Sequence, residues 1–265
     1  MSLVNIYAND DNRSLEIKNK VINELQKNNF EISEHFSDKA VLNICIGGDG
    51  TFLKAVHESN LSQIPFVGVN TGHLGFYQEI LEENIASFIE SFKNDNYMVT
   101  NLSLLTCQIE NNEVMNTYYA LNEFVLKTRN HSIIHLDVMI NGYKLEKFAG
   151  DGVIISTPSG STAYNFSVGG SILFQELDGY QLSPIAPINS RAYRSLPSSI
   201  VLPKDTKLNI EPYFRNMNQI DLIIDGNVLN TGSVSSYKFT FGDKKIKKLV
   251  FNSNWYWYNI KDKFL

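Results

Sequence analysis

Residues 1–100 alternate short apolar runs with stretches of helical periodicity. The runs at 3–8, 41–46 and 64–69 are rich in Val, Ile and Leu, which is typical of buried strands. Helices are expected after Ser14, the predicted N-cap, after Thr51, and over residues 82–93. The face of the first helix would carry Leu15, Val21, Ile22 and Leu25. Strands that alternate with helices predict an α/β domain with a parallel sheet over residues 1–100.

From residue 101 the pattern changes to short alternating runs separated by turn residues. Asn111-Asn112, Asn141-Gly142 and Asp225-Gly226 each lie between strand-like segments, and the latter two suit type I′ hairpin turns. Residues 101–250 are therefore predicted to form an antiparallel, all-β, sandwich-like domain. The tail, residues 251–265, is rich in aromatic residues, and we expect it to pack back on the body of the protein.

Composition and charge exclude several classes of protein. Of the 265 residues, 43% are hydrophobic and 19% are charged, as in globular domains. The net charge of −5 argues against a general nucleic-acid binder. No apolar run of about 18 residues predicts a membrane span, and the N-terminus does not resemble a signal peptide. Cys45 and Cys107 stand alone in apolar runs, so we expect free thiols and a cytoplasmic location.

A glycine-rich turn, GGDGT at residues 47–51, follows the second of the apolar runs and precedes a helix. This arrangement turns backbone N–H groups and a helix N-terminus toward an anion, and glycines let a phosphate approach closely. Asp49 is the ionisable residue of the turn. A carboxylate among phosphate-facing amides implies metal binding or removal of a proton from a hydroxyl. A plain turn is the alternative, because Gly and Asp are common turn formers.

Three stretches of the second half carry further candidate chemistry. Asn122-Glu123 ends a strand-like run, and the alternative is a solvated strand end. Asp151 lies between two glycines. Their lack of a side chain would let a ligand approach closely, and the alternative is that they simply form a turn. Residues 157–167 combine hydroxyls, amides and backbone in a polar surface that suits a ligand with sugar hydroxyls. A disordered Ser/Gly loop is the alternative there. There is no GxxxxGK(S/T), GxGxxG or HExxH motif, and the histidines lack metal-ligand spacing, so no fixed metal ligands are predicted.

These motifs together resemble those of NAD kinases. GGDGT at 47–51, GHLGF at 72–76, LNE at 121–123, GDG at 150–152 and STPSGSTAYN at 156–165 match that family in order and spacing over essentially the whole chain. Residues 183–203 resemble the compact NAD kinases of Gram-positive bacteria. The resemblance implies the NAD kinase/diacylglycerol kinase-like fold and a homodimer or homotetramer. One departure is Ala149, where relatives often have Arg; Lys147 is a possible substitute.

The resemblance also implies roles for individual residues. Asp49 would contact the adenosine ribose of NAD and take the proton of its 2′-hydroxyl, with Gly50 beside it and Phe76 near the adenine. Asn122 and Glu123 would bind the ribose and adenine side. The other expected NAD-binding residues, some of them from a neighbouring subunit, are Asp151, Ser159, Thr162, Ala163, Tyr164, Asn165, Phe166, Ser167, Ala186 and Ile188. The phosphate-binding residues would be Gly47, Gly48, Gly50 and Thr51.

The implied reaction moves the γ-phosphoryl group of ATP to the 2′-hydroxyl of NAD, giving NADP, with Mg²⁺ accompanying ATP. No membrane or nucleic-acid partner is expected. The sequence leaves open whether polyphosphate replaces ATP, whether NAD or NADH is preferred, and whether NADP(H) regulates the enzyme. Two alternatives are a lipid or sphingoid kinase of the same superfamily, which would need an apolar acceptor channel, and a non-catalytic NAD-binding sensor. The presence of Asp49 favours an enzyme, because a sensor that only binds NAD would not need this acid.

Overall fold

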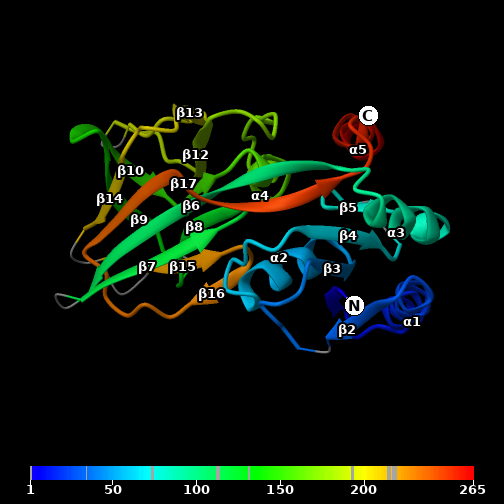
Figure 1. The fold of residues 1–265 in the computed structure, drawn as a ribbon. Helices are drawn as coiled ribbons and strands as arrows, with labels where there is room; N and C mark the ends of the chain where they lie inside the picture. The colour runs from blue at the N-terminus through cyan, green and yellow to red at the C-terminus, as the bar shows by residue number, and fades with distance from the viewer. Residues whose placement is uncertain are drawn as a thin grey trace. The chain divides into compact units, whose positions relative to one another are not determined.

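The computed structural model describes residues 2–33, 35–72, 75–111, 114–130, 132–191, 194–213, 216 and 220–265. Contacts divide the chain into a first unit, Met1–Asn101 with Ile246–Leu265, and a second unit, Leu102–Lys245 (Figure 1). Residues 246–250, which the sequence pattern assigns to the second domain, thus belong to the first unit. Of the predicted features, His73 and Leu74 of the GHLGF motif and Asn112 of the first turn lie outside the described residues.

The first unit is built on a parallel sheet of order β4-β3-β1-β2. A short strand, β5, and Lys248 of β17 both pair in parallel with β4. Ile44 and alternate apolar residues of β3 join α1 and α3 in one core cluster on one face of the sheet. The elements are β1 (Ser2–Ala8), α1 (Asn12–Lys27), β2 (Phe30–Ser33), β3 (Leu42–Gly47), α2 (Asp49–Glu58), β4 (Phe66–Asn70), β5 (Gln78–Ile80), η1 (Glu82–Asn84), α3 (Ile85–Lys93) and α5 (Trp255–Phe264).

Helix α1 begins earlier than the sequence predicts. Its N-cap is Asp11, whose carboxylate accepts the backbone N–H of Ser14 at 2.9 Å, so Ser14 lies inside the first turn. The buried positions are Ser14, Ile17, Val21 and Leu25, whereas Leu15 is 41% exposed. The predicted N-cap and face were therefore partly wrong. In the described part of the chain, no helix combines the length and apolarity needed to cross a membrane.

The second unit is a sandwich of two sheets, which confirms the predicted β-rich domain. One sheet is fully antiparallel with the order β13-β12-β11-β8-β15-β16. Strands of both sheets contribute to one apolar core, for example Phe124 and Ile155 from one and Leu136 and Phe239 from the other. Its elements are β6 (Met98–Asn111), β7 (Val114–Ala120), β8 (Glu123–Thr128), β9 (Ile134–Ile140), β10 (Tyr143–Gly150), β11 (Gly152–Ser156), η2 (Ser159–Thr162), α4 (Tyr164–Ser167), β12 (Gly179–Ile185), β13 (Ile200–Pro203), β14 (Leu208–Pro212), β15 (Ile220–Ile224), β16 (Asn227–Leu229) and β17 (Ser236–Val250). Strands β6 and β17 cross the boundary between the units.

Both predicted type I′ hairpins are confirmed. A type I′ turn needs a positive φ at each of its two central residues. The angles are 50° and 80° for Asn141 and Gly142, and 46° and 84° for Asp225 and Gly226. The second of these turns joins β15 to β16 and places Asp225 in a buried position.

Candidate active site

The GGDGT turn connects β3 to α2 in the first unit. Gly47 has a φ of 151°, and a Cβ there would lie 2.2 Å from Oγ1 of Thr51, so only glycine fits. Gly48 is the N-cap of α2, and Asp49 is its first residue. A Cβ on Gly48 or Gly50 would meet no atom within 4 Å. These two glycines therefore leave open space above the helix N-terminus, as an incoming phosphate requires.

The carboxylate of Asp49 is held in place by the chain segment that precedes β5. Its oxygens accept the backbone N–H groups of Phe76 at 3.2 Å and Tyr77 at 3.0 Å. The side-chain amide of Gln78 donates to the carbonyl of Gly48 at 2.7 Å, which ties the same segment to the turn. The Asp49 side chain remains 31% exposed. Asp49 is thus an oriented, accessible carboxylate that can accept a hydrogen bond from a hydroxyl.

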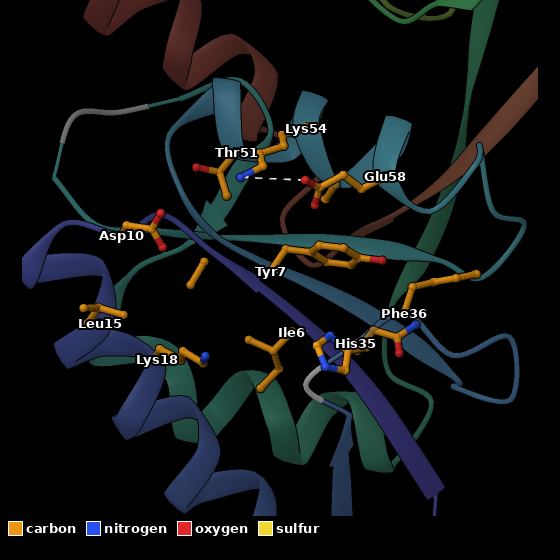
Figure 2. Close-up of a pocket in the computed structure, with 13 residues that line it drawn as sticks. Ile6, Tyr7, Asp10, Leu15, Lys18, His35, Phe36, Thr51, Lys54 and Glu58 are labelled. Atoms are coloured by element: carbon orange, nitrogen blue, oxygen red, sulfur yellow. Dashed lines mark ion pairs between the residues drawn. The ribbon is translucent and has the colours of Figure 1, made fainter.

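A pocket of about 380 Å³ lies beside the turn in the first unit (Figure 2). The recorded pairing of β1 with β2 ends at Asn5 and Ser33, and the remaining residues of β1 line the pocket. Thr51 of the GGDGT motif and Lys54, which pairs with Glu58 at 3.7 Å, line the side formed by α2. The other lining residues are Asn5, Ile6, Tyr7, Ala8, Asp10, Leu15, Lys18, His35, Phe36, Ala55 and Glu58. The pocket combines an open strand edge with two lysines, Lys18 and Lys54, and two carboxylates, Asp10 and Glu58.

In the second unit, Asp225 organises the Asn122-Glu123 turn. Its carboxylate accepts three backbone N–H groups, from Leu121 at 2.8 Å, Asn122 at 2.7 Å and Glu123 at 3.1 Å. Sequence reasoning treated Asp225 only as a hairpin residue. Its buried carboxylate comes from a hairpin turn about a hundred residues away in the sequence, so no local pattern marks it as a partner of this turn.

Glu123 is held in an unusual protonation state. The side chains of Asn122 and Glu123 are 6% and 5% exposed, so the alternative of a solvated strand end is wrong. Burial, together with the charge of Asp225, raises the pKa of Glu123 to about 8. Its Oε2 has no hydrogen-bond partner among the described residues. At neutral pH, Glu123 is therefore mostly a neutral acid that can donate a hydrogen bond to a ligand.

Replacing Glu123 with Gln should change how stability depends on pH. Unfolding returns the carboxyl pKa from about 8 to 4.5, so between these values the folded state holds a proton that the unfolded state releases. Stability therefore falls as pH rises through this window. We expect Glu123→Gln to leave the free energy of unfolding nearly unchanged at pH 4.5 and to raise it by about 2–4 kcal/mol at pH 8.

Urea titrations at these two pH values measure the effect, with the exposed Glu176→Gln as control. Equal differences between Glu123→Gln and the parent protein at both values would contradict the assignment.

Residues 157–167 form η2 and α4, so the alternative of a disordered loop is wrong. Several of their polar groups point inward. The Thr157 hydroxyl donates to the Leu121 carbonyl at 2.6 Å. The Asn165 side chain is fully buried; it donates to the Ser161 carbonyl at 3.1 Å and accepts the Ser183 hydroxyl at 2.6 Å. Asn165 therefore supports the segment from inside, which departs from the prediction that it contacts NAD.

Other residues of this stretch offer a surface to a ligand. Phe166 is 40% exposed, Ser167 is exposed, and Thr162, Ala163 and Tyr164 are partly exposed, whereas Ser159 is 7% exposed. Tyr164 packs against Val125 and Ile154 on the outer face of β8 and β11. Nζ of Lys127 lies 5.9 Å from the centroid of the Tyr164 ring. Tyr164, Val125 and Ile154 thus form an apolar surface, which we call the Tyr164 shelf, with the cation of Lys127 at its edge.

The remaining predicted residues lie on the segments after β10 and β12. Asp151 is exposed, and its backbone N–H donates to the Ile185 carbonyl at 3.1 Å. Ala186 has a positive φ of 44°, and the N–H of Ile188 donates to the carbonyl of Ala149 at 2.8 Å. Ala149 is fully buried, whereas Lys147 lies 6.0 Å from the ring of Tyr213. That Lys147 takes the place of an arginine at position 149 stays a prediction.

Known proteins are similar to this chain along nearly its whole length. Residues 4–97 match the ATP-NAD kinase N-terminal domain, and residues 121–250 match the ATP-NAD kinase C-terminal domain. An NAD kinase of Finegoldia magna is 51% identical over 99% of this chain and 98% of its own length. An NAD kinase of Staphylococcus epidermidis is 36% identical over 98% of this chain and 96% of its own length.

Solved structures show the same fold. Yeast NADH kinase complexed with NADH has a TM-score of 0.84 at 20% identity, covering 99% of this chain and 87% of that one. An NAD kinase from Archaeoglobus fulgidus in complex with ATP has a TM-score of 0.77 at 20% identity, and the match covers 99% of this chain and 98% of that one. Because these sequence relatives match along nearly their whole length and both family domains are found, this chain belongs to the NAD kinase family.

Proposed function

We propose that this protein transfers the γ-phosphoryl group of ATP to the 2′-hydroxyl of the adenosine ribose of NAD, forming NADP. Membership of the NAD kinase family supports this activity. The observation that carries the mechanism is the placement of Asp49 at the N-terminus of α2, held by two backbone N–H groups and still partly exposed. A ribose hydroxyl is a weak nucleophile at neutral pH, and Asp49 would orient it and accept its proton.

The donor's phosphates would lie over the open glycines of the turn. Backbone N–H groups at the start of α2 would face their charge. The pocket beside Thr51 is the proposed place for the donor's nucleoside, because the free edge of β1 offers backbone donors and acceptors to a base. Lys18 and Lys54 would face the donor there, with Lys54 exchanging its partner Glu58 for a phosphate oxygen.

A divalent cation is expected to arrive with the donor. Among the residues that the structure describes, no group of three or more His, Cys, Asp and Glu side chains gathers as a cation site. Mg²⁺ bound to the triphosphate would neutralise part of its charge.

Each unit contributes candidate residues for binding the acceptor's adenosine. In the first unit these are Asp49, Gly50 and Phe76. In the second they are Asn122, the neutral acid Glu123, and the Tyr164 shelf. A dimer or tetramer that completes the site, and a cytoplasmic location, stay predictions.

A coupled assay tests the proposed function. Purified protein is incubated with NAD, ATP and Mg²⁺, and an NADP-specific dehydrogenase reports the product. We expect a signal that needs all three components. A signal with inorganic polyphosphate in place of ATP would change the donor only. No signal with either donor, alongside measurable NAD binding, would contradict the proposal and favour a non-catalytic NAD sensor.

A further inference from the structure

The C-terminal helix α5 lies against the segment that holds Asp49. Both belong to the first unit. The ring of Phe76 lies 6.1 Å from that of Tyr256 and 6.2 Å from that of Phe264, centroid to centroid. Trp255, at the start of the helix, is 8% exposed. Because the N–H of Phe76 also donates to Asp49, the last turn of α5 is placed beside the candidate base.

Lys263, in that last turn, faces the candidate base. Its Nζ lies 3.7 Å from Oδ2 of Asp49 and 4.7 Å from the centroid of the Phe76 ring. A carboxylate and an aromatic face both attract an ammonium group, so the lysine is held from two sides. Its side chain remains 29% exposed, which leaves room for a ligand to reach it.

The other lysines recorded around the turn form their ion pairs with other residues, although the charge of Asp49 also acts on Lys248. Lys248 is buried, pairs with Glu79 at 3.5 Å, and has a pKa lowered by that burial. Lys54 is 65% exposed at the side chain and pairs with Glu58. The GGDGT turn itself contains no basic residue. Within the described residues, Lys263 is the cation recorded in an ion pair with Asp49.

In the proposed reaction, the phosphoryl group in transfer would lie close to Asp49 and hence to Lys263. The acceptor oxygen must lie within about 3 Å of the base, and the γ-phosphorus must approach that oxygen to about 3–3.5 Å. An ammonium group 3.7 Å from Oδ2, on a flexible stem, would then be within reach of the non-bridging oxygens of that phosphoryl group. The negative charge on those oxygens largely determines the activation barrier of phosphoryl transfer, and cations fixed beside them lower that barrier.

We propose that Lys263 is a catalytic residue that binds the phosphoryl group in transfer. This inference rests on the proposed function and adds a residue to it. A bond forms between the ribose oxygen and the γ-phosphorus while the bond from that phosphorus to the β–γ bridging oxygen breaks. The hydroxyl proton passes to Asp49, and ADP leaves with the bonding electron pair. Lys263 keeps its proton and exchanges Asp49 for a phosphoryl oxygen as its partner.

Three variants test this role. Lys263→Met removes the charge but keeps the length of the side chain, Lys263→Arg restores the charge, and Lys261→Met is the control on an exposed lysine of the same turn. We expect Lys263→Met to lower kcat about 100-fold, with the KM for NAD changed by less than about threefold and Tm unchanged. Lys263→Arg should recover about tenfold or more of the loss. Lys261→Met should match the parent protein.

Binding of inorganic tripolyphosphate, measured by calorimetry, gives a second readout that needs no turnover. Lys263→Met should weaken it about tenfold relative to both the parent and Lys261→Met. A kcat within twofold of the parent, a loss confined to the KM for NAD, or unchanged tripolyphosphate binding would each overturn the role of Lys263. A parent protein with no NAD kinase activity would overturn the proposed function instead, and the binding comparison would still decide whether Lys263 recognises phosphate.

Discussion

Replacing Asp49 with Asn is expected to lower kcat about 1000-fold while changing the Kd for NAD by less than about threefold. The amide keeps the size of the carboxylate and one acceptor oxygen for the N–H groups of Phe76 and Tyr77. It cannot take a proton from a ribose hydroxyl. The loss therefore falls on the chemical step and spares most of the binding.

Steady-state kinetics and calorimetric titration with NAD separate the two effects. Asp38→Asn is the matched control, because Asp38 is an exposed aspartate of the same unit. A kcat for Asp49→Asn within tenfold of the parent would contradict the assignment of Asp49 as the base. A loss of NAD binding equal to the loss of kcat/KM would instead make Asp49 a binding residue.

Replacing Gly160 with Ala is expected to destabilise the second unit by about 3 kcal/mol or more. A Cβ there would lie 2.1 Å from the carbonyl oxygen of Asn122 and 2.6 Å from its Cα. The backbone of Asn122 has little freedom to retreat. Its N–H donates to Asp225 at 2.7 Å, and its carbonyl accepts the N–H of Thr157 at 2.9 Å. The clash is therefore relieved only by separating η2 from the Asn122-Glu123 turn.

Urea unfolding of Gly160→Ala measures this cost. Gly72→Ala is the control, because a Cβ at Gly72 meets no atom within 4 Å, and its free energy of unfolding should stay within about 1 kcal/mol of the parent. A Gly160→Ala protein as stable as the Gly72→Ala protein would show that the contact with Asn122 is looser than the structure indicates.

The strands and tight turns that are marked by a local residue pattern were predictable from the sequence. Buried parallel strands are near-continuous apolar runs, and the Asn-Gly and Asp-Gly turns demand positive φ, so the α/β and β-rich halves and both type I′ hairpins followed. The start of α1 did not follow, because Asp11 and Ser14 are both good N-caps and only the buried side of the helix decides between them.

The direction of polar side chains was not predictable in the same way. The sequence shows hydroxyls and amides at 157–167, but whether one faces a ligand or the interior depends on how η2 and α4 pack. Asn165 faces Ser161 and Ser183 for that reason. The contacts of Asp225 with the Asn122-Glu123 turn and of Lys263 with Asp49 join segments about 100 and 200 residues apart, which periodicity does not report.

The measurement that tests the central claim most directly is the position of the phosphate on the product. The purified protein is incubated with NAD, ATP and Mg²⁺, and the product is isolated and examined by phosphorus NMR and mass spectrometry. We expect one added phosphomonoester on the 2′-oxygen of the adenosine ribose, formed by the parent protein and not by Asp49→Asn. A phosphate on any other oxygen, or an unmodified dinucleotide after ATP has been consumed, would contradict it.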